Sequence, residues 1–192
     1  MTWFLGANYF CMKMMRYSLI FWLPFYLEKA MGYDKITAGY ASTSFEVGGV
    51  LGVIAGGFLA DRVFGRRRIA AAAVMTAGLA GALWLHSALG NQGIGATYAS
   101  MMLIGALLFG PDSIVSGAVS QDLGGPYAAA LACGVINGLG SIGAVCQGYM
   151  VDYVSDTYGW EALFSVFLGL AIVGTLALLP FFFHRPADDL PG

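Results

Sequence analysis

Six apolar segments, each long enough to cross a lipid bilayer, constrain the fold of this chain more than any other feature. They run approximately over residues 3–29, 37–60, 69–89, 96–119, 127–151 and 161–183. A spanning helix needs about 20 mostly apolar residues, and no segment alternates in the manner of a membrane β-barrel strand. We therefore expect an all-α membrane protein whose six transmembrane helices form one bundle, residues 1–183, followed by a polar tail, residues 184–192.

The composition agrees with a lipid environment. Charged residues make up 10% of the chain and the mean hydropathy is +0.73, whereas a soluble domain carries about 25% charged residues. The three cysteines, Cys11, Cys133 and Cys146, all fall in apolar runs without metal-ligand spacing. We expect them to be small core residues, and we expect neither a metal nor a cofactor.

The positive charges predict the orientation in the membrane. Six spans place the second and fourth connections and both termini on one side. That side carries Arg62, Arg66, Arg67, Arg68 and Arg185. The opposite side carries Lys29 and Lys35. Because cytoplasmic loops are enriched in Lys and Arg, we expect both termini to be cytoplasmic, in an inner or plasma membrane.

Two cations, Lys13 and Arg16, lie inside the first apolar segment. Arg16 is about 20 Å along a helix that starts near Trp3, at 1.5 Å per residue, which places it near the middle of a hydrocarbon core about 30 Å thick. Lys13 lies one turn earlier on the same face. Each charge costs about 3 kcal/mol at the bilayer centre. Both side chains must therefore face a wet cavity or a negatively charged group.

Two interpretations of this pair remain open. The cations can pair internally with Glu46 or Asp112 and hold the bundle together, since buried charges are normally paired. Alternatively they bind an anionic substrate, because the planar fork of Arg suits phosphate oxygens and Lys adds a point charge. Nearby aromatic residues, Tyr9, Tyr17 and Trp22, offer hydroxyl contacts or a wall. The candidate substrate-binding residues are Arg16, Lys13, Tyr17, Glu46 and Asn137.

Glycines and prolines also follow a pattern. Gly48, Gly52 and Gly56 recur every four residues in the second segment, and Gly134 and Gly138 do so in the fifth, followed by Gly140 and Gly143. Such stripes allow close helix–helix packing; the alternative is that they form faces that rock during transport. Pro24 and Pro111 take matching places if the six helices form two sets of three.

Two stretches resemble a known family. "GGFLADRVFGRRR", residues 56–68, resembles the cytoplasmic loop motif of the major facilitator superfamily. Its matching residues here are Gly57, Asp61, Arg62, Gly65, Arg66 and Arg67. "RYSLIFWLPFYL", residues 16–27, resembles the seventh helix of the organophosphate:phosphate antiporters, and the likeness continues through "GALLFGP" and "GVINGLGSIGAVCQGYMVD" to "YGWEALF".

The resemblance implies a twelve-helix architecture of which this chain is the C-terminal six-helix half, built from two inverted three-helix repeats. Arg16 matches the family's phosphate-binding arginine, and a second arginine belongs to an N-terminal half that this chain would require as a partner. The implied function is half of a secondary active transporter. It would move a phosphate ester, such as glycerol-3-phosphate or a sugar phosphate, in exchange for inorganic phosphate by alternating access.

Other functions remain as alternatives. The chain could belong to a transporter of another organic anion, or to a non-transporting membrane sensor of a phosphorylated ligand. An enzyme is not expected, because His86 and His184 fall near opposite membrane faces, where both are expected to be interfacial. Nucleic-acid binding is not expected either, since the clustered arginines are explained as a topological anchor.

Overall fold

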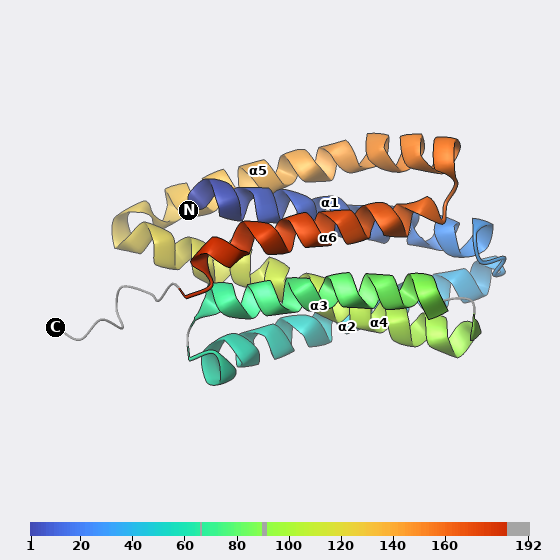
Figure 1. Cartoon of the computed structure of the whole chain (residues 1–192), viewed down its shortest axis with the longest axis horizontal. Coiled ribbons are helices and arrows are strands. Elements are labelled where there is room, and N and C mark those ends of the chain that lie inside the picture. Colours follow the sequence, from blue (N-terminus) through green and yellow to red (C-terminus); the bar gives the residue numbers. More distant parts are fainter. Residues whose placement is uncertain (66, 90–91, 184–192) are drawn as a thin grey trace.

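The structure, a computed structural model, describes residues 1–65, 67–89 and 92–183 as a bundle of long helices lying side by side (Figure 1). Arg66 of the loop motif and the expected tail, residues 184–192, lie outside the described residues. The α-helices are α1 (Thr2–Lys29), α2 (Lys35–Phe58), α3 (Arg68–Leu89), α4 (Ile94–Ser113), α5 (Ser120–Tyr158) and α6 (Ala162–Leu178). Two π-helical segments, η1 (Leu59–Val63) and η3 (Ile114–Val119), extend α2 and α4, and a 3₁₀ turn, η4 (Leu179–Phe181), extends α6. The described part of the chain contains no strand, as the all-α prediction requires.

Five of these helical stretches are long and apolar enough to cross a membrane. They cover Lys35–Val63, Arg68–Ala88, Ile94–Val119, Ala129–Tyr158 and Ala162–Phe181. The remaining helix, α1, has 28 residues and lies alongside α5 and α6 in the same bundle (Figure 1). Lys13 and Arg16 lie within it. The chain is a multi-pass integral membrane protein.

The helix ends follow local chemistry. The Asp34 carboxylate caps α2 by accepting hydrogen bonds from the backbone N–H groups of Ile36 and Thr37, at 3.1 and 3.2 Å, which satisfies donors that a helix start leaves unpaired. Within the part of the chain that the structure describes, four connections contain a glycine with positive φ: Gly32, Gly65, Gly93 and Gly159. Such left-handed conformations cost other residues about 1–2 kcal/mol, so glycine allows these connections to be short.

The helix packing has an internal symmetry. The most extensive pairs are α2 with α4, α1 with α5, and α3 with α6. If α1, α2 and α3 are equivalent to α4, α5 and α6 in that order, the α1–α5 pair is equivalent to the α4–α2 pair. The α3–α6 pair is then equivalent to itself. This is the pattern expected of two three-helix repeats. Pro24 in α1 and Pro111 in α4 lie toward the ends of equivalent helices.

The glycine row of α2 is a packing surface within the bundle. A Cβ atom at Gly48 would fall 2.8 Å from the Met102 Cα, and one at Gly52 would fall 2.6 Å from the Ala106 carbonyl carbon. Gly56 approaches Gly110 in the same way. The α2 and α4 backbones therefore touch directly, which is the packing interpretation of this stripe.

The glycines of α5 divide into two groups. Gly143 lies against the backbone of Phe10 and Gly140 against Tyr9 and Lys13, so this pair seats α5 on α1. At Gly134 and Gly138, a Cβ would meet no atom of the described residues within 4 Å. The prediction of one packing face is therefore incomplete, because the second pair points away from the bundle.

The helix α5 is longer than the apolar segment 127–151 suggests. Its helical backbone begins at Ser120, turns back at the end of the bundle shared with Met1, and continues to Tyr158 (Figure 1). Hydropathy identifies only the part of a helix that lipid requires, and helical turns beyond that part carry no such signal.

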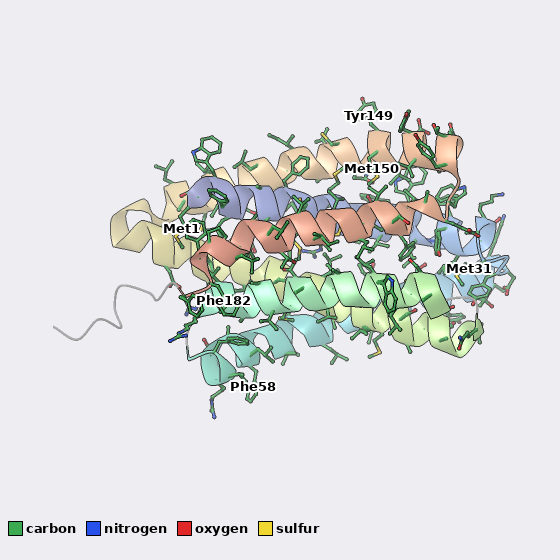
Figure 2. All side chains as sticks on the ribbon, viewed as in Figure 1. Met1, Met31, Phe58, Tyr149, Met150 and Phe182 are labelled. Carbon is green, nitrogen blue, oxygen red and sulfur yellow. The ribbon has the colours of Figure 1, made fainter. Side chains whose placement is uncertain are left out.

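The two ends of the bundle carry different groups. Met1, Phe58 and Phe182 lie toward one end and Met31 at the other (Figure 2). The first end also holds η1 and the reversal between α4 and α5 (Figure 1). There Arg68 pairs with Asp122, its Nη1 lying 2.6 Å from the Asp122 Oδ1, and it also reaches the Ala118 carbonyl at 3.4 Å.

Candidate functional site

One face of α1 carries the polar groups on which the site is built. Tyr9, Lys13 and Arg16 follow a spacing of four and three residues, which aligns them along the helix. The Lys13 ammonium lies 5.1 Å from the centre of the Tyr9 ring, within the distance at which a cation and an aromatic face attract. Gly140 of α5 makes room, since a Cβ there would clash with the Tyr9 ring, whose Cε1 would be 2.8 Å away, and would fall 3.2 Å from the Lys13 Cδ.

Arg16 pairs with a carboxylate from α4. Its Nη1 lies 2.5 Å from the Asp112 Oδ2, and the Arg16 and Asp112 side chains are 30% and 6% exposed. The guanidinium carbon lies 4.0 Å from the centre of the Phe109 ring. Phe109 precedes Asp112 by three residues, so α4 presents a stacking surface and an anion side by side. The flat guanidinium of Arg16 stacks on the Phe109 ring and donates to the Asp112 carboxylate.

The helix α2 holds that stacking surface in place. Phe45 meets Phe109 edge to face, with ring centres 5.4 Å apart. Gly49 lies directly behind Phe109, where a Cβ would fall 2.8 Å from the ring. The close α2–α4 contact therefore positions Phe109, and Phe109 positions Arg16.

Two polar atoms at this site remain unsatisfied. Asp112 Oδ1 and Arg16 Nε are buried and have no hydrogen-bond partner among the described residues. Buried polar atoms are normally bonded, and an unpaired atom of a charged group is the most costly case. The site therefore retains bonding capacity next to its ion pair.

The α4 backbone changes form at this point. Asp112 follows Pro111 and precedes the π-helical segment η3. Such π segments occur frequently at functional sites. Ser116 of η3 hydrogen-bonds to the Tyr9 side chain, which links the segment to the polar face of α1.

Some of the predicted substrate-binding residues lie close to Arg16 in the structure, and others do not. Tyr17 lies one turn beyond Lys13 and contacts Phe21, with ring centres 6.0 Å apart. Glu46 lies on the exposed face of α2, so the carboxylate that pairs with Arg16 is Asp112. Asn137 donates through its side-chain amide to the Cys133 carbonyl of its own helix at 3.0 Å. Trp22 contacts Trp160, at 6.2 Å between ring centres, rather than the charged cluster.

Sequence reasoning did not select Phe109 or Ser116. Phe109 is one of 13 phenylalanines in the chain, and Ser116 lies in an apolar run. The sequence feature that could have identified them is their spacing from Asp112. Phe109 lies three residues before Asp112 and Ser116 four residues after it, which places all three on one helix face.

The loop motif occupies η1 and the turn after it. Gly57, Asp61 and Arg62 are exposed. Gly65 has φ of 55°, and the Arg67 N–H donates to the Phe64 carbonyl at 3.1 Å. The motif thus ends α2 with a π turn followed by a left-handed glycine, a common way to terminate a helix.

A cavity lies at the other end of the bundle. It measures about 420 Å³, and Tyr26, His86, Glu161 and Phe164 contribute to its lining. His86 is 2% exposed; its Nδ1 lies 2.9 Å from the Ser100 hydroxyl and its Nε2 lies 3.3 Å from the Tyr26 hydroxyl. His86 thus lies near the end of α3, but polar partners from α1 and α4 satisfy its ring inside the bundle, whereas the prediction expected an interfacial ring. His184 lies outside the described residues.

Comparisons with known proteins are consistent with this architecture. The sequence profile of the Major Facilitator Superfamily matches residues 5–192. The chain is 35% identical over 180 residues to the putative glycerol-3-phosphate transporter 1 of Arabidopsis thaliana, covering 88% of this chain and 34% of that protein. It is 35% identical over 183 residues to sugar phosphate exchanger 3 of Mus musculus, covering 90% and 36%.

A third relative is the glucose-6-phosphate exchanger SLC37A2 of Danio rerio. It is 32% identical over 173 residues, which cover 86% of this chain and 34% of the relative. The chain therefore spans about a third of the length of the curated relatives that it matches.

Proposed function

The chain belongs to the major facilitator superfamily, and from this membership we propose that it forms one half of a secondary transporter for an organic phosphate ester. Glycerol-3-phosphate and sugar phosphates are the proposed substrates, because the relatives' names refer to them. Exchange for inorganic phosphate by alternating access is the proposed mode of transport.

The observation that carries the proposal is a charge imbalance. Within the described residues the cluster contains two cations, Lys13 and Arg16, and one carboxylate, Asp112. Ionised groups inside a membrane bundle are costly and normally paired. The surplus positive charge supports an anion as the ligand, and the unpaired Arg16 Nε supports a ligand with acceptor oxygens.

The chemistry of the two cations suits a phosphate group. Arg16 has five N–H donors in a planar fork, and its bond to Asp112 is made through Nη1. Asp112 and Phe109 thus hold the guanidinium in a defined orientation while donors remain for phosphate oxygens. Lys13, one turn away, adds a second positive charge.

The site is open on one side, which supports a second half as the partner. The Arg16 side chain is 30% exposed, and the 420 Å³ cavity does not include it. A ligand held near the midplane between two halves that rock is a common transporter arrangement. We propose an N-terminal six-helix half, with an arginine of its own, as the missing wall.

The distribution of arginines supports a cytoplasmic location for both termini. Arg62, Arg67 and Arg68 lie at the end of the bundle that also holds Met1 (Figure 1). Lys29 and Lys35 flank the opposite end. The proposed location is an inner or plasma membrane.

Arg16→Lys tests the phosphate clamp. The variant keeps the charge but loses the fork, and phosphate counterflow in proteoliposomes should fall at least about 10-fold, the value of one charge-assisted hydrogen bond. The assay uses the chain reconstituted with its proposed N-terminal half. Lys35→Arg, which also exchanges one cation for another and lies at the exposed start of α2, is the matched control and should transport normally. Wild-type counterflow by Arg16→Lys would refute the clamp, and binding without counterflow in the unaltered protein would favour a sensor.

A further inference from the structure

Asp112 carries an acceptor that the ion pair does not use. Its Oδ2 is bonded to Arg16, whereas its Oδ1 is buried without a partner among the described residues, and the residue as a whole is 4% exposed. An ionised carboxylate can only accept hydrogen bonds. A ligand that reaches Oδ1 must therefore bring a hydrogen-bond donor.

The neighbouring cations demand the opposite property. Arg16 and Lys13 offer only donors, so the same ligand must present negatively charged acceptor oxygens to them. A fully deprotonated anion would satisfy the cations but would set a bare oxygen against the Asp112 carboxylate, where like charges repel.

A phosphate group that keeps one proton satisfies both requirements. Phosphate monoesters lose their second proton near pH 6, so a fraction retains a P–OH group around neutral pH. The P–OH group can donate to Asp112 Oδ1 while the other oxygens accept from Arg16 and Lys13. Sulfate and sulfate esters carry no such proton under these conditions.

We infer that Asp112 is a specificity-determining residue whose Oδ1 accepts a hydrogen bond from a protonated phosphoryl oxygen, so that the site binds hydrogen phosphate and protonated phosphate esters and rejects sulfate and sulfate esters. This inference rests on the proposed function. The bond between Asp112 Oδ2 and Arg16 remains intact in the complex. Because Oδ1 is buried, ligand binding requires the side chains around it to move aside.

Competition binding tests the inference. Radiolabelled inorganic phosphate is bound to the purified transporter, this chain together with its proposed second half, in lipid nanodiscs and displaced with sulfate, methyl phosphate or methyl sulfate. With the wild-type chain, sulfate and methyl sulfate should compete about 100-fold or more weakly than their phosphate counterparts, since sites that hydrogen-bond a ligand OH reject analogues without it strongly. Asp112→Asn, whose amide can donate, should reduce this preference to within about 5-fold, and Asp112→Glu should keep most of it.

The outcomes separate the inference from the proposed function. Equal competition by sulfate, with phosphate binding that still depends on Arg16, would overturn the role of Asp112 and leave the phosphate site standing. Absence of phosphate binding by the wild-type chain assembled with its second half would overturn both. If Asp112→Asn fails to fold, as judged by size-exclusion chromatography, the wild-type comparison of methyl phosphate with methyl sulfate decides alone.

Discussion

Lys13 and Arg16 lie one helical turn apart, yet their surroundings differ. Arg16 is oriented by a carboxylate and a ring from α4, whereas the contact of the Lys13 ammonium is the Tyr9 ring of its own helix. A cation–π contact is worth about 0.5–1 kcal/mol at partly exposed sites, which does not offset the desolvation of an ammonium. The position of Arg16 inside the bundle is explained both by its structural contacts and by ligand binding. The position of Lys13 is explained better by ligand binding.

Lys13→Met separates these explanations. Methionine keeps a flexible chain of similar length and removes the charge, so phosphate binding in nanodiscs should weaken about 10-fold while thermal stability in detergent is retained.

Asp112→Ala is the contrasting variant. It leaves Arg16 without its partner and should lower stability by about 3 kcal/mol, the low end for buried pairs, because the Arg16 side chain is 30% exposed. Loss of stability in Lys13→Met would show that the ammonium is structural.

The cap of α2 gives a prediction about pH. Hydrogen bonds from the Thr37 hydroxyl and from the Thr37 and Ile36 backbone N–H groups hold the pKa of the exposed Asp34 carboxyl below its ordinary value. A lowered pKa means that the ionised cap stabilises the fold fully above the unfolded pKa, about 3.9, and loses this contribution as the pH falls through the folded pKa.

Asp34→Ala should therefore lower the thermal midpoint at pH 7, and the gap to wild type should narrow below about pH 4. At pH 7 the thermal midpoint of Asp34→Asn, which can still cap the helix, should lie between those of wild type and Asp34→Ala. A gap that stays constant from pH 7 to pH 3 would contradict an ionised cap.

At the scale of elements, the α2–α4 contact decides how precisely the site is built. The backbones touch along Gly48, Gly52 and Gly56. The Phe109 ring of α4 packs against α2 and carries the Arg16 guanidinium on its face. A side chain in this row separates the helices, since the nearest atoms are backbone and cannot rotate away. The row is thus a structural requirement of the binding site as well as of the bundle.

Gly52→Ala should destabilise the protein by about 2 kcal/mol or more, in the range of overpacked cores, and should weaken phosphate binding through displacement of Phe109. Gly57→Ala is the matched control on the same helix, because a Cβ there meets nothing within 4 Å and alanine favours helix by about 0.5–1 kcal/mol. Thermal unfolding in detergent with phosphate binding measures both. Equal stability of the two variants would contradict the close contact.

The elements were more predictable than the contacts between them. Hydropathy and length revealed the helices, and the sequence also placed Arg16 within α1. The partner of Arg16 did not follow, because Glu46 and Asp112 are both carboxylates in apolar helices. One step along α2 rotates a side chain by about 100°; Phe45 faces the core and Glu46 next to it faces outward. Helix rotation is set by tertiary packing, and a single sequence does not encode it locally.

At the scale of the whole molecule, the outer surface is not uniform. In their spanning parts, 17% of the α5 residues and 33% of the α2 residues are buried, against 61% in α3. The helix α6 is also 33% buried, but its mean hydropathy of 2.5 suits lipid, whereas α2 and α5 reach 1.5 and 1.7. The exposed face of α2 includes Glu46, and that of α5 includes Gly134 and Gly138.

The exposed face of α5 is suited to another protein surface. Small residues bring helices together in membranes. Gly134 and Gly138 leave open space on a helix that also carries large exposed side chains such as Tyr149, which projects from the bundle in Figure 2. Lipid chains require neither feature. We expect the faces of α2 and α5 to contact the proposed N-terminal half.

Gly138→Leu tests this arrangement. Because a Cβ at Gly138 meets nothing within 4 Å inside this half, the variant should fold with the thermal stability of wild type. The added side chain should hold the second half away, so that co-purification with that half and phosphate counterflow both fall, about 5-fold or more if the obstruction costs 1–3 kcal/mol as overpacking does. Val173→Leu, on the exposed surface of α6, enlarges a residue that faces lipid in this arrangement and should change neither. Normal co-purification and counterflow by Gly138→Leu would mean that α5 faces lipid, and the open side of the Arg16 site would then need a different partner.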